Sequence, residues 1–210
     1  MDYETEEQQV EALKKWWAEN GKSVILGVGI GAFAIFGWQG WNKHQLSKAR
    51  EASDGYQQTL AALGGEGDAV EIAKDVKDDH SGSLYATMAA LAAARSAVEK
   101  SDLETAEKEL RWAVSNSPQE EISTIARVRL ARVQGALGKH KDAFKTLPGK
   151  APEAFTALVE EVRGDLYSAT GEAEKARVAY QAALDSGESG GDRNTLEMKL
   201  NELAVADSSN

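Results

Sequence analysis

The residue types that could perform chemistry are few in this chain of 210 residues, and they lie far apart. No two of the three histidines, His44, His80 and His140, have the spacing that lets one helix face hold a metal ion. The nearest approach to a ligand set is KDDH, residues 77–80, which a solvated polar loop explains more simply. The chain has no cysteine, which excludes disulfides, thiolate metal sites and cysteine nucleophiles.

Other catalytic patterns are also missing. Serines and aspartates are plentiful, so a triad assembled in space from distant residues stays open. No nucleophile-elbow sequence is present. We therefore expect no enzyme activity, no bound metal and no cofactor.

The stretch VILGVGIGAFAIFG (residues 24–37) matches the dinucleotide-binding pattern G-x-G-x-x-[GA] at Gly27, Gly29 and Ala32. That pattern indicates a nucleotide site only between a strand and a helix, with an acidic residue about 20 residues further on. Residues 23–42 carry no charge, and no strand pattern precedes them. Twenty helical residues span roughly 30 Å, the thickness of a bilayer's hydrocarbon core. The stretch therefore predicts a transmembrane helix over residues 23–42.

The flanks of this segment favour an uncleaved signal anchor. A cleaved signal peptide would have a short basic leader and a small-x-small cleavage site. The leader here is 22 residues long and acidic, and GWQGWNKH offers no such site. Lysine and tryptophan side chains favour the two membrane interfaces. The expected interfacial residues are Trp16, Trp17, Lys22, Trp38, Trp41 and Lys43.

Within the span, Gly27 and Gly31 have the GxxxG spacing that lets two membrane helices approach closely. Glycine is common in membrane helices, so a helix–helix contact and a plain lipid-facing span both stay open. In either case we expect the pair to belong to the membrane anchor.

The leader, residues 1–22, is predicted to be a cytoplasmic amphipathic helix. EEQQVEALKKWW places Val10, Leu13 and one of the two tryptophans on one face, and Asn20-Gly21 is expected to end the helix. Such a helix can lie on the inner membrane surface or against a partner's helix. A frayed tail is disfavoured because it would leave two tryptophans in water.

The net charge is −10, divided as −3 in residues 1–22 and −7 in residues 43–210. An acidic domain repels phosphate backbones, so we expect no nucleic-acid binding. Three lysines before the span and three basic residues soon after it leave the orientation open by the positive-inside rule. A large domain after an uncleaved anchor is usually translocated. We therefore expect a cytoplasmic N-terminus and a C-terminal domain beyond the inner membrane.

Residues 43–80 are predicted to form a membrane-proximal helical segment. A first helix continues to Leu63 and is closed by Gly64-Gly65, and a shorter helix runs from Asp68 to about Val76. Whether the first of these is continuous with the span stays open.

Residues 81–206 contain a repeat with the spacing of tetratricopeptide units, 34-residue helical hairpins with G-x2-Y in the first helix and A-x3-aromatic in the second. Small residues let the two helices approach, and tyrosines fill the space beside them. A second unit lies 33 residues upstream of the clearest one, and part of a third lies another 37 upstream. The alternative is an alanine-rich helical bundle without true repeats. In the first two units, Gly164, Gly171 and Ala176 match Ala131, Gly138 and Ala143. The third repeats only the second helix, where Ala106, Leu110 and Ala113 match Ala176, Tyr180 and Ala183.

The predicted fold is all-α, with one N-terminal transmembrane helix followed by a tetratricopeptide-like helical solenoid. One helix pair cannot bury its apolar face alone, so the units must stack and the ends must be capped. DRNTLEMKLNELA is expected to form the C-terminal cap helix, with Asp192 or Asn194 as its N-cap. Residues 207–210 are expected to be a flexible tail.

Stacked helix pairs form a concave groove lined mainly by the first helix of each pair. Its apolar side chains could hold a peptide, and its charged side chains could fix the register of that peptide. Alternatively, Arg95 and Arg132 pair with acids on neighbouring helices, and both interpretations stay open. By helical phase, the expected partner-binding residues are Met88, Leu91, Arg95, Ile125, Val128, Arg132, Glu161 and Asp165.

With these features together, the chain resembles the YfgM family of Gram-negative bacteria. The likeness covers essentially the whole chain and rests on QVEALKKWWAENGKS, GWQGWNKHQ, RLARVQ and RGDLYSATGEAEKAR. The resemblance implies a single-span inner-membrane protein with its N-terminus in the cytoplasm and its repeats in the periplasm. It further implies an ancillary component of the SecYEG channel that partners the periplasmic chaperone PpiD. The family offers no catalytic residues to carry over.

Two functions follow from the resemblance. The first is a translocon-associated adaptor or chaperone-like subunit that binds PpiD, the SecYEG channel or emerging unfolded polypeptides through its repeats. The alternative is a membrane-tethered regulator of an envelope stress response that acts through its cytoplasmic leader. A coiled-coil assembly protein is disfavoured because the chain shows no sustained heptad.

Overall fold

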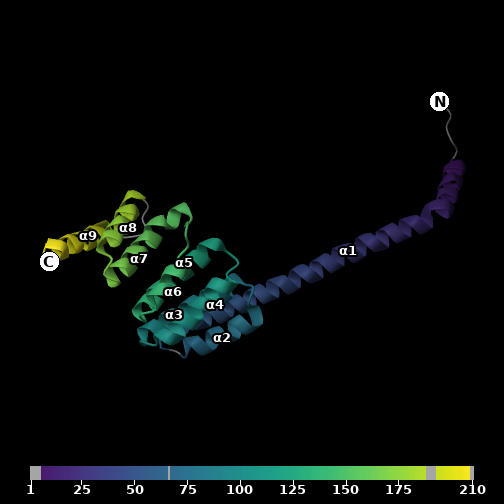
Figure 1. Cartoon of the computed structure of the whole chain (residues 1–210). Coiled ribbons are helices and arrows are strands. Elements are labelled where there is room, and N and C mark those ends of the chain that lie inside the picture. Colours follow the sequence, from purple (N-terminus) through teal and green to yellow (C-terminus); the bar gives the residue numbers. More distant parts are fainter. Residues whose placement is uncertain (1–5, 66, 188–192, 209–210) are drawn as a thin grey trace. The chain divides into compact units, whose positions relative to one another are not determined.

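The computed structural model describes residues 6–65, 67–187 and 193–208, which form helices and the turns between them without any strand. The predicted all-α class is confirmed. Two compact units divide the chain, Met1–Lys48 and Ala49–Asn210. Figure 1 labels the α-helices: α1 (Glu6–Leu63), α2 (Ala69–His80), α3 (Leu84–Glu99), α4 (Leu103–Asn116), α5 (Glu120–Ala136), α6 (His140–Thr146), α7 (Thr156–Ala169), α8 (Ala173–Asp185) and α9 (Arg193–Ser208). A short 3-10 turn, η1 (Glu153–Phe155), precedes α7.

Helix α1 carries the segment predicted to cross the membrane. It contains an apolar window of mean hydropathy 1.5, none of which is buried, and is long enough to span a bilayer. The prediction that the leader helix ends at Asn20-Gly21 is wrong, because α1 continues through both residues. The Asn20 amide donates to the Trp16 carbonyl oxygen at 3.0 Å, and the Trp17 ring lies over Gly21. Both potential helix-ending residues are thus held within the helix by side-chain contacts one turn away. The same helix also runs on past the span to Leu63.

The C-terminal part of α1 packs with α2 as a first helix pair. Ala52 and Thr59 are fully buried. A Cβ on Gly55 would lie 2.5 Å from Cγ2 of Val76, so the two helices touch closely at this point. The second helices of the successive pairs, α2, α4, α6 and α8, begin at residues 69, 103, 140 and 173, offsets of 34, 37 and 33 residues. The repeat spacing therefore extends into the segment before residue 81.

Helix α2 is longer than the sequence indicates, and Asp68, the predicted first residue, is its N-cap. The Asp68 side chain accepts a hydrogen bond from the Val70 amide at 2.9 Å. The KDDH sequence lies in the last turn of α2 rather than in a loop. Its Lys77 forms a buried ion pair with Glu109 of α4 and lies 5.6 Å from the ring centroid of Trp112. This pair joins the second helices of the first two repeats.

Consecutive helices from α2 to α6 pack against one another, as do α7 with α8 and α8 with α9 (Figure 1). Most of the buried apolar side chains are alanine. In the pair α7–α8, a Cβ on Gly164 would lie 2.4 Å from Cε1 of the Tyr180 ring. Tyr180 is buried, and its hydroxyl donates to Asp165 at 2.8 Å. A small residue facing a large one thus sets the close approach of these two helices.

Three turns between first and second helices share one backbone geometry. Their central residues, Ser101, Gly138 and Gly171, have φ of 61°, 73° and 78°. In each turn the next amide donates back to a carbonyl five residues earlier, as in Asp102 to Ala97 at 2.8 Å. This is the Schellman motif, which favours glycine at the left-handed position. Serine occupies that position only in the turn between α3 and α4.

Helix α9 covers the last repeat. Its Leu196 and Leu203 are buried in a cluster with Ala176, Tyr180 and Ala183. Of the two predicted N-caps, Asp192 lies outside the described residues, and Asn194 lies within the helix. The predicted tail, residues 207–210, begins too early, because no glycine or proline interrupts α9 before Ser208. The rest of that tail lies outside the described residues.

The shared turn geometry predicts opposite effects of two substitutions. Ser101→Gly should raise the free energy of unfolding by about 0.5–1 kcal/mol, because a side chain at positive φ is strained. Gly171→Ala should lower it by about 1 kcal/mol for the same reason. Thermal unfolding of the full chain in mild detergent, followed by circular dichroism, measures both. Shifts of the same sign would contradict a shared turn.

Candidate functional site

Helices α3 and α5, the first helices of two successive pairs, border a surface hollow of about 380 Å³. Three residues predicted to face a groove, Leu91, Arg95 and Arg132, line it together. The floor is completed from below by Leu110 of the intervening helix α4. We call this site the α3–α5 hollow; its lining residues are Leu91, Ala94, Arg95, Val98, Glu99, Leu110, Arg129, Arg132 and Val133.

The floor of the α3–α5 hollow is apolar. Ala94, Leu110 and Val133 are buried beneath it, and Leu91 is half-buried. Val98 stands at the rim with 44% of its surface exposed. An apolar ligand side chain that covered this floor would gain about 25 cal/mol for each Å² removed from water.

The rim of the hollow is positively charged. Arg95 pairs with Glu99, one turn along α3, at 2.8 Å, and both side chains are at least half exposed. Arg132 lies 3.6 Å from Glu161 of α7. Within the part of the chain that the structure describes, Arg129 makes no ion pair or hydrogen bond. The interpretation that Arg95 and Arg132 pair with acids on neighbouring helices is therefore confirmed for Arg132 and wrong for Arg95, whose acid lies on its own helix.

Three other predicted groove residues do not line the α3–α5 hollow. Val128 is 1% exposed and packs in a core cluster with Val159 and Val162 of α7, so it belongs to the core instead of a binding surface. Helix α5 turns this face toward α7, because a helix in a stacked repeat has neighbours on more than one side. Met88 and Ile125 are half-buried away from the hollow.

Glu161 and Asp165, the two remaining predicted groove residues, form ion pairs with the last helix. Lys199 of α9 lies 2.9 Å from Glu161 and 2.7 Å from Asp165. Asp165 also accepts the Tyr180 hydroxyl, and burial together with this hydrogen bond raises the pKa of Tyr180. These acids tie the last helix to the last repeat.

Several residues of the hollow were not predicted from the sequence. Arg129 lies three residues before Arg132 and so shares its helix face, a signal that helical spacing contains. Val98 and Glu99 lie on the last turn of α3, where the same spacing from Leu91 and Arg95 extends the stripe. Leu110 comes from a second helix, and only the packing of α4 beneath α3 and α5 could show it.

A second hollow of about 410 Å³ lies among α4, α5 and α6. Three of its four charged side chains form ion pairs, and the fourth, Arg127, has none among the described residues. Arg111 pairs with Glu107 at 2.6 Å, and Lys145 lies 3.9 Å from Asp142. We call it the α4–α6 hollow; its lining residues are Arg111, Val114, Ser115, Arg127, Leu130, Gln134, Asp142, Lys145 and Thr146.

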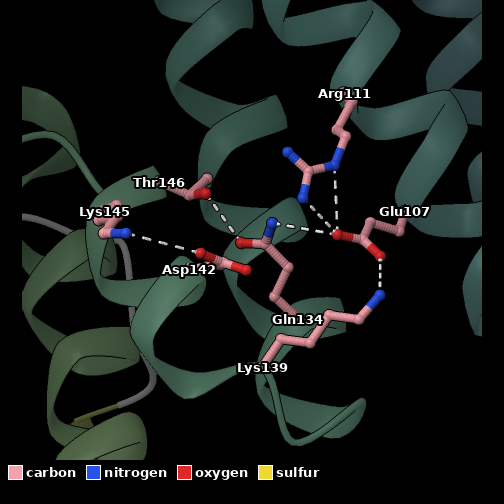
Figure 2. Close-up of polar contacts among 7 residues, drawn as sticks. All are labelled: Glu107, Arg111, Gln134, Lys139, Asp142, Lys145 and Thr146. Carbon is pink, nitrogen blue, oxygen red and sulfur yellow. Dashed lines mark hydrogen bonds and ion pairs between the residues drawn. The ribbon is translucent and has the colours of Figure 1, made fainter.

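Figure 2 shows the polar network beside the α4–α6 hollow, centred on Glu107. The Glu107 carboxylate accepts from Lys139 at 2.6 Å, from Arg111 at 2.6 Å and from Gln134 at 3.3 Å. Gln134 is fully buried and accepts from Thr146 at 2.8 Å. The hydrogen bond from Lys139, opposed by burial and reinforced by Arg111 and Gln134, lowers the pKa of Glu107 to about 2. The network joins three helices of two repeats.

The described residues hold no group of three or more histidine, aspartate or glutamate side chains that could bind a metal ion. Among the histidines, Nδ1 of His140 is buried without a hydrogen-bond partner in the described part of the chain. A single histidine nitrogen without a neighbouring polar partner forms neither a catalytic pair nor a set of metal ligands.

The predicted interfacial residues all lie on α1, and their side chains are exposed. Trp16 and Trp17 stack obliquely with ring centroids 6.5 Å apart. Gly27 and Gly31 have no heavy atom within 4 Å of a built Cβ, so this stretch of the helix surface is open.

A long apolar helix followed by stacked helix pairs defines the class of a helical-repeat protein with one candidate membrane span. Residues 14–205 match the family model described as a tetratricopeptide repeat-like domain. The chain is 34% identical to the ancillary SecYEG translocon subunit of Escherichia coli K12, over 97% of this chain and 98% of that protein. No solved structure matches the chain.

Other relatives bear the same name. The Haemophilus influenzae protein is 33% identical over 94% of this chain and 97% of its own length. The Neisseria gonorrhoeae protein is 25% identical over the same shares. The chain belongs to the YfgM family, and the resemblance drawn from its sequence motifs is confirmed.

The Glu107 network predicts a pH-dependent contribution to stability. At pH 7, Glu107→Gln should lower the free energy of unfolding by about 2–4 kcal/mol, because the charged partners lose their acceptor. The lowered pKa means that this contribution is fully present above the ordinary value of 4.5 and is lost as the pH falls toward about 2. The difference in free energy of unfolding between the wild type and the Glu107→Gln variant should therefore become smaller as the pH falls over that range.

Urea unfolding of the full chain in mild detergent at pH 7, 4 and 3 measures this difference. Glu104→Gln, an exposed glutamate on the same helix, controls for the loss of one negative charge. A difference that stayed constant between pH 7 and pH 3 would contradict the proposed role of the Glu107 carboxylate.

Proposed function

We propose that this protein is a membrane-anchored ancillary subunit of the SecYEG translocon. The observation that carries the proposal is the match of the chain, apolar helix included, to a protein of that name over 97% of this chain. Repeats alone would fit many binding proteins, but the apolar helix adds an anchor beside a membrane channel.

The proposed topology places residues 1–22 in the cytoplasm, residues 23–42 across the inner membrane and the repeats in the periplasm. The length of the apolar segment and the uncleaved character of its flanks support this arrangement. In such a topology the repeats would stand beside the exit of the channel.

The α3–α5 hollow is the proposed partner-binding surface. A translocating chain emerges unfolded, with apolar segments exposed and prone to aggregation. A hollow with an apolar floor, tethered near the exit, meets such a chain at high effective concentration, so each contact can be weak. The proposed partners are emerging unfolded polypeptides and a periplasmic chaperone of the PpiD type. The role is one of binding and requires no catalytic residue.

Purification of the full chain in mild detergent tests the association. We expect channel subunits and a PpiD-type chaperone to co-purify with the wild-type protein. Val98→Asp in the α3–α5 hollow should lower capture of the chaperone severalfold, because it places a carboxylate on the apolar rim. Val178→Asp, at a 70% exposed valine of α8, is the matched control and should leave capture unchanged.

Purification of the wild-type protein without any channel subunit would contradict the proposed association. Equal effects of the Val98 and Val178 variants would remove the hollow from the partner-binding surface.

The absence of native cysteines allows a direct test of topology. Single cysteines at Thr5 and Ser209 are labelled with a membrane-impermeant maleimide in cells whose outer membrane is permeable. We expect labelling of Ser209→Cys but not of Thr5→Cys. The reverse pattern would place the repeats in the cytoplasm and overturn the proposal, and lysed cells, in which both sites react, provide the control.

A further inference from the structure

The α3–α5 hollow has a charge opposite to that of the protein as a whole. The chain carries a net charge of −10. The hollow is nevertheless lined by three arginines, Arg95, Arg129 and Arg132, and by a single acid, Glu99. Local charge at a docking surface governs partner choice more than net charge does, because salt screens charges beyond about 10 Å.

The three arginines are available to a ligand to different degrees. Arg129 has no partner among the described residues and is exposed. The Arg95–Glu99 pair joins two exposed side chains on one helix, an arrangement that contributes little and is easily exchanged. Arg132 lies 3.6 Å from Glu161, too far for a good hydrogen bond, and its side chain is 45% exposed. Guanidinium groups bind carboxylates bidentately, so each of these arginines prefers an acidic partner.

The floor between the arginines requires an apolar group. The hydrocarbon that a ligand can reach is that of Leu91, which is half-buried, and of Val98, which is 44% exposed. Both lie beside Ala94, Leu110 and Val133, which are already buried. A purely acidic ligand would leave this surface in water, and a purely apolar ligand would leave Arg129 unpaired. The combination selects a segment that carries both kinds of side chain.

We propose that the α3–α5 hollow binds a polypeptide segment with a large apolar side chain flanked by aspartate or glutamate, and that it discriminates against the same segment flanked by lysine. This inference rests on the proposed function and adds the chemistry of the partner. The occupant is a segment of this composition in an emerging unfolded polypeptide.

The other hollow provides an internal control for the proposal. Arg127 lies on the same helix as Arg129, two residues earlier, and also has no ion pair or hydrogen bond in the described part of the chain. It lines the α4–α6 hollow instead of the α3–α5 hollow. The substitution Arg127→Glu therefore changes the net charge of the protein by the same amount as Arg129→Glu, but it alters no residue of the proposed site.

The test uses the full chain in detergent and two fluorescent peptides of about a dozen residues with identical leucine positions. One peptide carries glutamates beside the leucines and the other carries lysines. We expect fluorescence anisotropy to show about tenfold tighter binding of the glutamate peptide at low salt, with a difference that shrinks as salt is added. Arg129→Glu should weaken binding of the glutamate peptide about tenfold and strengthen binding of the lysine peptide, whereas Arg127→Glu should change neither.

The gain toward the lysine peptide separates a reversed preference from a misfolded variant, which would bind neither peptide better. Equal affinities of the wild type for the two peptides would overturn the inference, as would equal effects of the Arg127 and Arg129 variants. If channel subunits still co-purified in that case, the proposed function would stand without the acidic preference. If no channel subunit co-purified while the glutamate preference was found, the proposed function would fail and the site would remain.

Discussion

The structure depends on close approach between helices that bury mostly alanine. Because alanine offers little area, each contact is stabilising only where the backbones come near each other. Gly164 opposite Tyr180 shows the limit of this approach, since a Cβ would lie 2.4 Å from the ring. No single helix pair buries enough surface by itself, and stability requires the whole stack. A change at one such contact is therefore felt by the neighbouring repeats.

Close packing of adjacent helices leaves open space between alternate ones. The α3–α5 and α4–α6 hollows are both of this kind, and helix α5 contributes to each. Their charges are used differently. Beside the α4–α6 hollow, the buried carboxylate of Glu107 binds cations from two repeats and holds the stack together. In the α3–α5 hollow, Arg129 keeps its charge available at the surface. The α4–α6 hollow thus adjoins an ion-pair network that joins two repeats, whereas the α3–α5 hollow combines three exposed arginines with apolar side chains.

Features that are marked by a local residue pattern could be predicted from the sequence, and features that arise from contacts between side chains could not. The apolar span and the turns at Gly138 and Gly171 have strong residue signatures, whereas the same turn at Ser101 lacks the glycine that would mark it. Helix α1 continues through Gly21, where the Trp17 ring packs against the backbone, a contact that no residue pattern encodes. Phase alone did not separate the buried Val128 from the exposed Arg132, because helix α5 has packed neighbours on several sides. Site residues that lie on one helix could therefore be predicted from the sequence, and those brought together from several helices could not.

If a translocating chain occupies the α3–α5 hollow, a photoreactive residue placed there should crosslink to a secreted chain that is arrested in the channel of living cells. The photoreactive residue replaces Leu91 in the hollow or, as a control, the exposed Lys108 on α4. We expect an adduct with the arrested chain from position 91 and none from position 108. An adduct from position 108 alone, or from neither position while channel subunits co-purify, would show that the chain does not occupy the hollow.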